Sequence, residues 1–154
     1  MNTEQYKKEI QRTWQTDGLT DREQICNATL GLVGEVGEYL DHKNIDELGD
    51  AFFYVYTLAR LLGAGTENLP HHTHSGTALA RQSAAIAEHV KKLLFHGPES
   101  RRHDATTWAV RYMISNLRHE SRQMSCPSVV MAINIKNLRR RYPDGFSPTY
   151  MDKK

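Results

Sequence analysis

Apolar residues recur at the 3.6-residue spacing of an α-helix along almost the whole of this chain. The alternation of apolar and polar residues that marks a half-buried strand is nearly absent, and no Asn-Gly or Asp-Gly turn lies between two apolar runs. The pattern therefore predicts an all-α fold. With 154 residues the chain is long enough to form one compact domain around a single core.

Capping and turn residues divide this pattern into six expected helices. Thr20 and Glu23 form a capping box that opens the second helix, and Asp17-Gly18 ends the first one. Asn44 and Pro127 are residues that favour a helix start, the first as a cap and the second at the first helical position. The expected helices cover residues 5–14, 21–42, 45–62, 78–95, 103–119 and 127–141.

Charge is divided unevenly along the chain. Residues 1–80 carry six Lys and Arg against twelve Asp and Glu, a net charge of −6, whereas residues 81–141 carry a net charge of +8. Such a division suits a site for a cation and a polyanion, although charges that only solvate helix faces would give the same pattern. We expect one domain, residues 1–154, with an acidic metal-binding half (1–62), a Gly- and Pro-rich linker (63–77) and a basic half (78–154).

Features of a membrane or secreted protein are missing from the sequence. The longest apolar run, Ala51 to Leu62, contains Arg60 and is too short to span a bilayer, and the N-terminal residues contain no apolar signal-peptide core. Cys26 and Cys126 lie far apart without CxxC spacing, so both are expected to be free thiols. We therefore expect a cytoplasmic protein with no membrane partner.

Two pairs of acidic residues carry the clearest chemical signal. Glu35 and Glu38 are three residues apart on one expected helix, and Glu47 and Asp50 are three apart on the next. Each pair occupies one helix face, and the short connection lets the two faces meet. Like charges at this spacing cost a few tenths of a kcal/mol per pair, a cost that a bound cation would reverse. Carboxylates without converging Cys or His favour Mg²⁺ or Mn²⁺, accompanied by a di- or triphosphate.

Three glycines accompany the first acidic pair. Gly31, Gly34 and Gly37 lie inside the same expected helix, where together they cost about 2.5–3 kcal/mol relative to alanine. Such a cost indicates that something approaches the helix backbone closely. The approaching group is either a neighbouring helix or a metal with its bound phosphates.

Other chemistries find little support. The chain has no GxxxxGK[ST] phosphate loop, no GxSxG elbow and no HExxH zinc motif. His71, His72 and His74 belong to the Gly- and Pro-rich linker and are expected to be solvated. Trp108 and Met113 follow helical spacing and are expected in the core, not on a base-stacking platform.

The stretch GLVGEVGEYLDHKNIDELGDAFFYVYTLARLLG resembles the MazG-like nucleotide pyrophosphohydrolases, whose signature is ExxE followed by ExxD. The segments KKLLFHG (91–97) and NIKNLRRRYPDGFS (134–147) are also similar to members of that family. The resemblance implies an all-α MazG-like bundle in which Glu35, Glu38, Glu47 and Asp50 hold Mg²⁺ on a nucleoside triphosphate. A metal-bound water, aided by Glu35 or Glu38 as catalytic residue, would then release the monophosphate and pyrophosphate.

The resemblance also implies substrate-binding residues and partners. Candidates for phosphate and nucleotide contacts are Lys91, Lys92, Asn134, Lys136, Arg139 and Arg140. Simple members carry the KKxLFHG segment between ExxE and ExxD, whereas here it follows the linker. This order implies a fused, diverged tandem of helical hairpins that imitates the family's dimer, with Ala85, Ala105 and Trp108 where the first copy has Glu35, Glu47 and Asp50. The expected partners are a nucleotide substrate and a second copy of the chain, as a homodimer.

Two other functions stay open at this point. The lost second acidic site, and Asn137 where relatives often carry lysine, would suit a catalytically idle nucleotide-binding or regulatory module. The basic second half with its run Arg139-Arg140-Arg141 would suit nucleic-acid binding, but no recognition motif accompanies it, so a nucleic-acid partner is not expected.

Overall fold

The structure, a computed structural model, describes residues 1–14, 18–71, 74, 76–97 and 99–146. These described residues form six α-helices and no β-strand, which confirms the expected all-α class. The helices are α1 (Thr3–Thr13), α2 (Asp21–His42), α3 (Ile45–Leu62), α4 (Thr77–Phe95), α5 (Ser100–Ser121) and α6 (Pro127–Arg141). The bounds of α2, α3 and α6 agree with those expected from the sequence. Helix α5 begins three residues earlier, because the Glu99 carbonyl already accepts hydrogen bonds from the backbone N–H groups of Arg102 and His103.

Local capping contacts fix the two helices that carry the acids. The Thr20 hydroxyl accepts a hydrogen bond from the Glu23 N–H at 3.3 Å, and the Glu23 carboxylate accepts one from the Thr20 N–H at 2.8 Å. Asn44 caps α3 by accepting the Glu47 N–H at 2.9 Å. Lys43 has a left-handed backbone with φ of 52°. Residues 43–44 alone therefore connect α2 to α3, and the two helices form a tight antiparallel hairpin.

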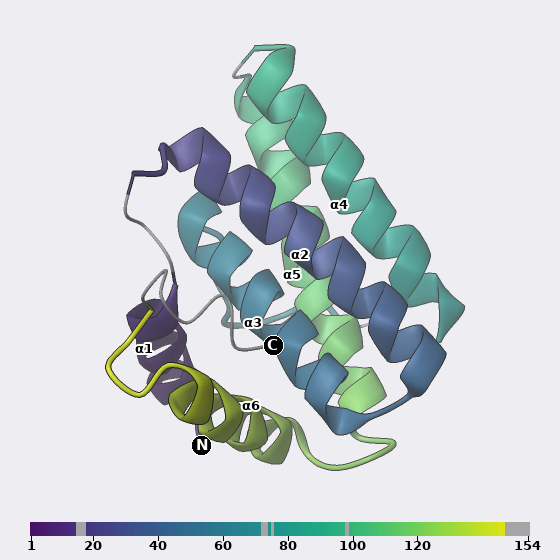
Figure 1. The fold of residues 1–154 in the computed structure, drawn as a ribbon. Helices are drawn as coiled ribbons and strands as arrows, with labels where there is room; N and C mark the ends of the chain where they lie inside the picture. Colours follow the sequence, from purple (N-terminus) through teal and green to yellow (C-terminus); the bar gives the residue numbers. More distant parts are fainter. Residues whose placement is uncertain (15–17, 72–73, 75, 98, 147–154) are drawn as a thin grey trace.

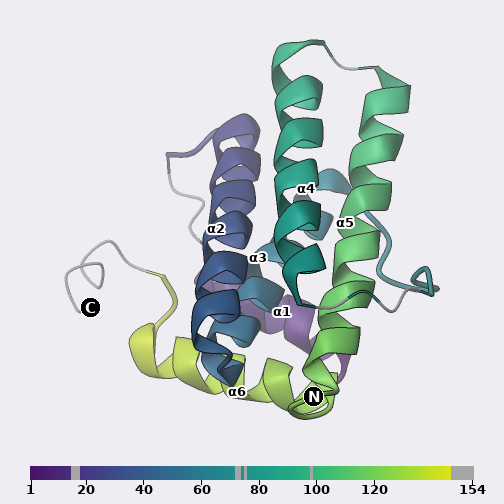
Figure 2. The same cartoon turned by 90° about the vertical axis from the view of Figure 1, so that its right-hand side faces the viewer.

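Two helical hairpins, α2–α3 and α4–α5, make up the main body of the fold (Figure 1). Helix α2 contacts α4 and α3 contacts α5, so the two hairpins pack against each other. Helices α1 and α6 contact each other and lie side by side at one end of the molecule (Figure 1). Helix α6 runs crosswise to the upright α2, α4 and α5 (Figure 2).

Helix α3 lies at the centre of the packing, in contact with α1, α2, α5 and α6. Eleven of its 18 residues are buried, including Phe52 and Val55 on the side predicted from the sequence. Phe53, Tyr56 and Ala59 are buried as well, because α1 and α6 pack on the side of α3 that lies outside the predicted apolar stripe. Full burial of a large apolar side chain contributes about 1.5–3 kcal/mol to folding, so α3 is the main source of core stability.

One expected core residue on α5 is exposed. Met113 is fully buried as expected, but Trp108 is 53% exposed, so its assignment to the core was wrong. Trp108 lies two residues, about 200° around the helix, from both Thr106 and Val110, which are buried. It therefore points away from the core, and its ring lies 6.0 Å from the guanidinium of Arg111.

The segment between α3 and α4 joins the two hairpins along the surface of α5. The Ser115 hydroxyl donates to the Pro70 carbonyl at 2.5 Å, and the His74 N–H donates to the Asn116 side chain at 3.3 Å. His71 and His74 are exposed, as expected, whereas His72 lies outside the described residues. No helix in the described part of the chain is both long enough and apolar enough to cross a membrane.

Candidate metal centre

The two acidic pairs meet in one cavity between α2, α3 and α6. The cavity has a volume of about 290 Å³, and all four acids, Glu35, Glu38, Glu47 and Asp50, line it. Glu35, Glu47 and Asp50 each offer one carboxylate oxygen, and these oxygens lie within 4.8 Å of one another. Oxygens that bind one octahedral Mg²⁺ at about 2.0–2.1 Å lie about 3 Å apart when adjacent and about 4 Å apart when opposite. The three acids, hereafter the acidic triad, are therefore close enough to converge on a single cation after small shifts of their side chains.

Glu38 lies in the cavity but outside the acidic triad. It is one turn beyond Glu35 on α2 and is exposed, whereas the triad residues are partly buried. Glu47 belongs to the first turn of α3, where the helix dipole favours a negative charge, and one of its oxygens lies 3.9 Å from the His42 imidazole. Asp50 lies beyond that first turn, so the dipole contributes less to it.

A buried chain of hydrogen bonds orients Asp50. The Asn134 amide of α6 donates to Asp50 Oδ1 at 2.7 Å, and the Tyr6 hydroxyl of α1 donates to Asn134 Oδ1 at 2.8 Å. Tyr6 is 0% and Asn134 1% exposed. A Cβ at Gly49 would lie 3.0 Å from the Asn134 Cβ, so a glycine here lets α3 and α6 approach closely. Two helices that contribute no acid to the triad thus orient Asp50.

The electrostatic surroundings leave Asp50 short of positive charge. Burial raises the pKa of Asp50 from 3.8 to about 6; Arg141 opposes this rise, Glu47 and Asp46 add to it, and the hydrogen bond from Asn134 lowers it. At neutral pH the carboxylate is therefore ionised in a site that disfavours its charge. A bound cation would remove this cost.

The cavity is completed by residues that the sequence reasoning missed. Phe53, Tyr54, Leu138, Arg141 and Tyr142 line it together with the acids. Burial, followed by the charges of Glu35 and Asp50, raises the pKa of Tyr54 to about 12, so its hydroxyl stays protonated. Helical spacing offered a signal for two of them. Tyr54 comes one turn after Asp50, and Arg141 comes two turns after Asn134, so both share a helix face with a predicted site residue.

The glycines of α2 have different surroundings. A Cβ at Gly31 would lie 2.2 Å from the Tyr54 ring, so the close neighbour there is α3 and not a ligand. Added Cβ atoms at Gly34 and Gly37 would meet nothing within 4 Å, and both glycines are exposed. Packing against another helix therefore explains the first glycine, and within the described residues it does not explain the other two.

Of the predicted substrate-binding residues on α6, the structure brings Asn134 to the acids, where it is buried against Asp50 and does not line the open cavity. Arg139 forms an ion pair of 2.6 Å with Glu9 on α1. Lys136 and Arg140 are exposed on α6 and do not line the cavity.

The remaining predicted substrate contacts lie on α4. Lys91 and Lys92 are bonded to Glu88 at 2.7 Å and 3.5 Å, and neither lines the cavity. The Arg22 guanidinium on the first turn of α2 donates to the Leu94 carbonyl, so this end of α4 lies beside the start of α2. The structure thus leaves both lysines apart from the acidic triad.

Comparison with protein-family models, with curated proteins and with solved structures found no match for this chain. The chemistry of the cavity therefore has to be judged from its geometry. Three converging carboxylates, a fourth beside them and an arginine at the same opening can hold a hard cation and the anionic group that accompanies it.

Proposed function

We propose that this chain hydrolyses nucleoside triphosphates to the monophosphate and pyrophosphate with the help of Mg²⁺ or Mn²⁺. The observation that carries the proposal is the acidic triad, whose oxygens lie within 4.8 Å of one another in a cavity that Arg141 also lines. An oxygen-only ligand set favours a hard divalent cation, and such cations in enzymes usually accompany phosphates. The likeness of the ExxE and ExxD segments to the MazG-like family supports the choice of the α–β phosphate bond.

The residues present fit such a cation. Glu35, Glu47 and Asp50 would hold it, and Asn134 would keep the Asp50 carboxylate in a fixed orientation. When bound, Mg²⁺ neutralises phosphate charge and lowers the pKa of a water ligand. Glu38 lines the same cavity outside the triad, and its exposed carboxylate is available to accept a proton from the attacking water.

The nucleotide would meet the part of the cavity formed by α3 and the end of α6. The Arg141 guanidinium offers a planar pair of donors for phosphate oxygens. Phe53, Tyr54 and Tyr142 offer aromatic surface on which a base can pack. Cation, phosphates and base would then occupy one cavity of about 290 Å³.

The test is pyrophosphate release from a panel of ribo- and deoxynucleoside triphosphates, with and without Mg²⁺. Glu47→Gln removes one triad carboxylate and should lower kcat/KM by about 100-fold or more. Glu88→Gln is the matched control: it removes the same charge from an exposed helix position in the second hairpin and should leave turnover unchanged. Circular dichroism of both variants checks that they remain folded.

Three outcomes are informative. Pyrophosphate release that requires Mg²⁺ and is lost in Glu47→Gln alone supports the proposal. Mg²⁺-dependent nucleotide binding without release of pyrophosphate would favour the idle nucleotide-binding module instead. Equal losses in Glu47→Gln and Glu88→Gln would mean that the activity does not depend on the acidic triad.

A further inference from the structure

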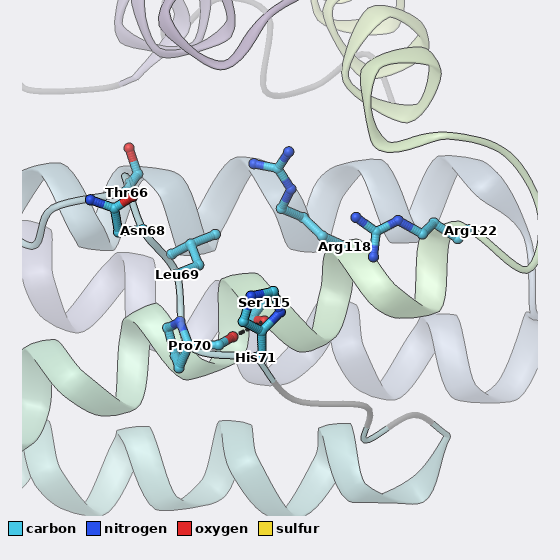
Figure 3. A pocket seen from close by; sticks show the side chains of 8 residues that line it. All are labelled: Thr66, Asn68, Leu69, Pro70, His71, Ser115, Arg118 and Arg122. Atoms are coloured by element: carbon cyan, nitrogen blue, oxygen red, sulfur yellow. Dashed lines mark hydrogen bonds between the residues drawn. The ribbon is translucent and has the colours of Figure 1, made fainter.

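A second cavity, separate from the acidic one, lies between residues 66–71 and the C-terminal half of α5 (Figure 3). Its volume is about 270 Å³. It shares no lining residue with the acidic cavity, which is formed by α2, α3 and the end of α6. Its chemistry can therefore be considered independently of the proposed hydrolysis.

Side chains of α5 hold the outer wall of this cavity in place. Arg111 donates to the carbonyls of Glu67 at 3.1 Å and Asn68 at 2.8 Å. Ser115 donates to the carbonyl of Pro70 at 2.5 Å (Figure 3). Asn68 adopts a left-handed backbone with φ of 47°, which turns the segment back toward α5. The cavity is thus already formed without a ligand.

Two arginines dominate the charge of the cavity. Arg118 lies in the last turn of α5, and Arg122 is the C-cap residue that follows the helix with a right-handed helical backbone. Because they are four residues apart, both side chains lie on one side of the helix end, and both line the cavity (Figure 3). His71 lines the cavity as well. Within the described residues, neither guanidinium forms an ion pair with a carboxylate.

The nearest acids in the sequence are turned to other partners. Glu120 is buried, accepting hydrogen bonds from the Tyr39 hydroxyl at 2.6 Å and the Gly76 N–H at 3.1 Å. Glu67 lies 3.9 Å from Lys7 of α1, and its side chain does not line the cavity. In the part of the chain that the structure describes, no carboxylate therefore neutralises the two positive charges of the cavity.

The helix dipole explains only part of this arrangement. It favours cations near the C-terminus of α5, which accounts for basic residues in the last turn. It does not account for two guanidinium groups at a spacing where like charges repel, beside a preformed polar cavity. An oxyanion between them would reverse the repulsion, because each planar guanidinium can give two parallel hydrogen bonds to phosphate oxygens.

We propose that the cavity between residues 66–71 and α5 binds the phosphoryl group of a small molecule, with Arg118 and Arg122 as its main ligands. Ser115 and Asn68 add polar surface to the site, and His71 adds an imidazole. No cation is needed. The site is therefore distinct from the acidic triad in both location and chemistry.

The test is isothermal titration calorimetry in EDTA with inorganic phosphate, pyrophosphate and a nucleoside monophosphate as separate ligands. Arg122→Gln should weaken binding by about tenfold or more, because a charge-assisted pair of hydrogen bonds is lost. Arg122 is exposed, so this variant should remain folded. Arg101→Gln, an exposed position at the other end of the same helix, removes the same charge and should leave the affinity unchanged.

The ligand series separates free phosphate from a phosphorylated molecule: a nucleoside monophosphate that binds more tightly than inorganic phosphate indicates the latter. Absence of binding by all three ligands overturns the proposal, as does an equal loss in Arg101→Gln. Binding that disappears in Glu47→Gln would assign the ligand to the acidic cavity and overturn the second site without affecting the proposed hydrolysis. A fourth titration uses a single-stranded oligonucleotide. If only this ligand binds, and its binding depends on Arg122, the site recognises nucleic acid, which overturns the proposal of a small-molecule ligand.

Discussion

Asp50→Asn removes a carboxylate whose burial raises its pKa from 3.8 to about 6. The folded chain therefore holds this proton more tightly than the unfolded chain, where the carboxyl has its ordinary pKa. By linkage, the stability contributed by Asp50 is greatest at low pH, falls as the pH rises from about 4 to about 6, and stays low above that range. Asparagine has nearly the same shape without the charge, so it avoids this loss.

The expected size of the effect follows from the shift in pKa. A shift of about two units corresponds to about 3 kcal/mol at pH 7.5. The hydrogen bond from Asn134 to a neutral amide oxygen is weaker than to a carboxylate by about 1 kcal/mol. Asp50→Asn should therefore stabilise the metal-free protein by about 2 kcal/mol, or about 4–8 °C in Tm for a chain of this size. At pH 4 the loss of folding free energy caused by the shifted pKa of Asp50 falls below about 1 kcal/mol in the wild type, so Asp50→Asn should no longer be more stable than wild type.

The assay is thermal and urea unfolding in EDTA at pH 7.5 and pH 4. Asp21→Asn serves as the control, because Asp21 is exposed in the first turn of α2, where the dipole favours its charge, and it does not contribute to the pKa shift of Asp50. This control should lose a few tenths of a kcal/mol at pH 7.5. An Asp50→Asn protein that is less stable than wild type at pH 7.5, or equally stabilised at both pH values, would refute the reasoning.

Three further predictions concern the same region. Gly31→Ala should destabilise the fold by about 1–3 kcal/mol, because its Cβ would lie 2.2 Å from the Tyr54 ring. Gly34→Ala should stabilise the fold by about 0.5–1 kcal/mol, because its Cβ would have nothing within 4 Å; urea unfolding of the two variants compares these effects. Asn134→Ala should cost about 2–4 kcal/mol and weaken Mg²⁺ binding about 10–100-fold in calorimetry, because Asp50 loses its donor. Mg²⁺ with a non-hydrolysable nucleotide should raise Tm by more than the sum of the separate shifts, and purely additive shifts would count against a shared site.

Local signals in the sequence were sufficient to predict the helices that carry the acids. Thr20 and Asn44 cap α2 and α3 through contacts three residues away, so the bounds of both helices could be read from neighbouring residues. The same is true of the acidic triad, because its residues lie within 16 positions of sequence on one hairpin. The second buried side of α3 was missed, since it depends on α1 and α6 packing against Phe53 and Tyr56.

The rest of the site depends on contacts between distant residues. Asn134 reaches Asp50 across 84 positions and Tyr6 across 128, so no local pattern could reveal that it orients a carboxylate. Its assignment as a substrate contact came from the resemblance, as did that of Lys91 and Lys92. The resemblance pointed only to segments of sequence, whereas the contact between Asn134 and Asp50 follows from how α6 crosses the hairpin.

Helix α6 links the acidic triad to the stability of the whole fold. It contributes none of the three carboxylates, yet Asn134 donates to Asp50, Asn137 donates to Asp46 at 2.9 Å, and Arg139 pairs with Glu9 on α1. Of these donors, Asn134 acts on the triad itself and opposes the repulsion that Asp50 experiences from the neighbouring acids. A cation in the triad would offset the same repulsion, and it would hold the Asp50 carboxylate in the orientation in which it accepts the hydrogen bond from Asn134. In the metal-free chain, the hydrogen bonds from Tyr6 of α1 to Asn134 of α6 and from Asn134 to Asp50 therefore offset part of the repulsion between the converging carboxylates. Binding of a cation should accordingly change the stability of both α1 and α6.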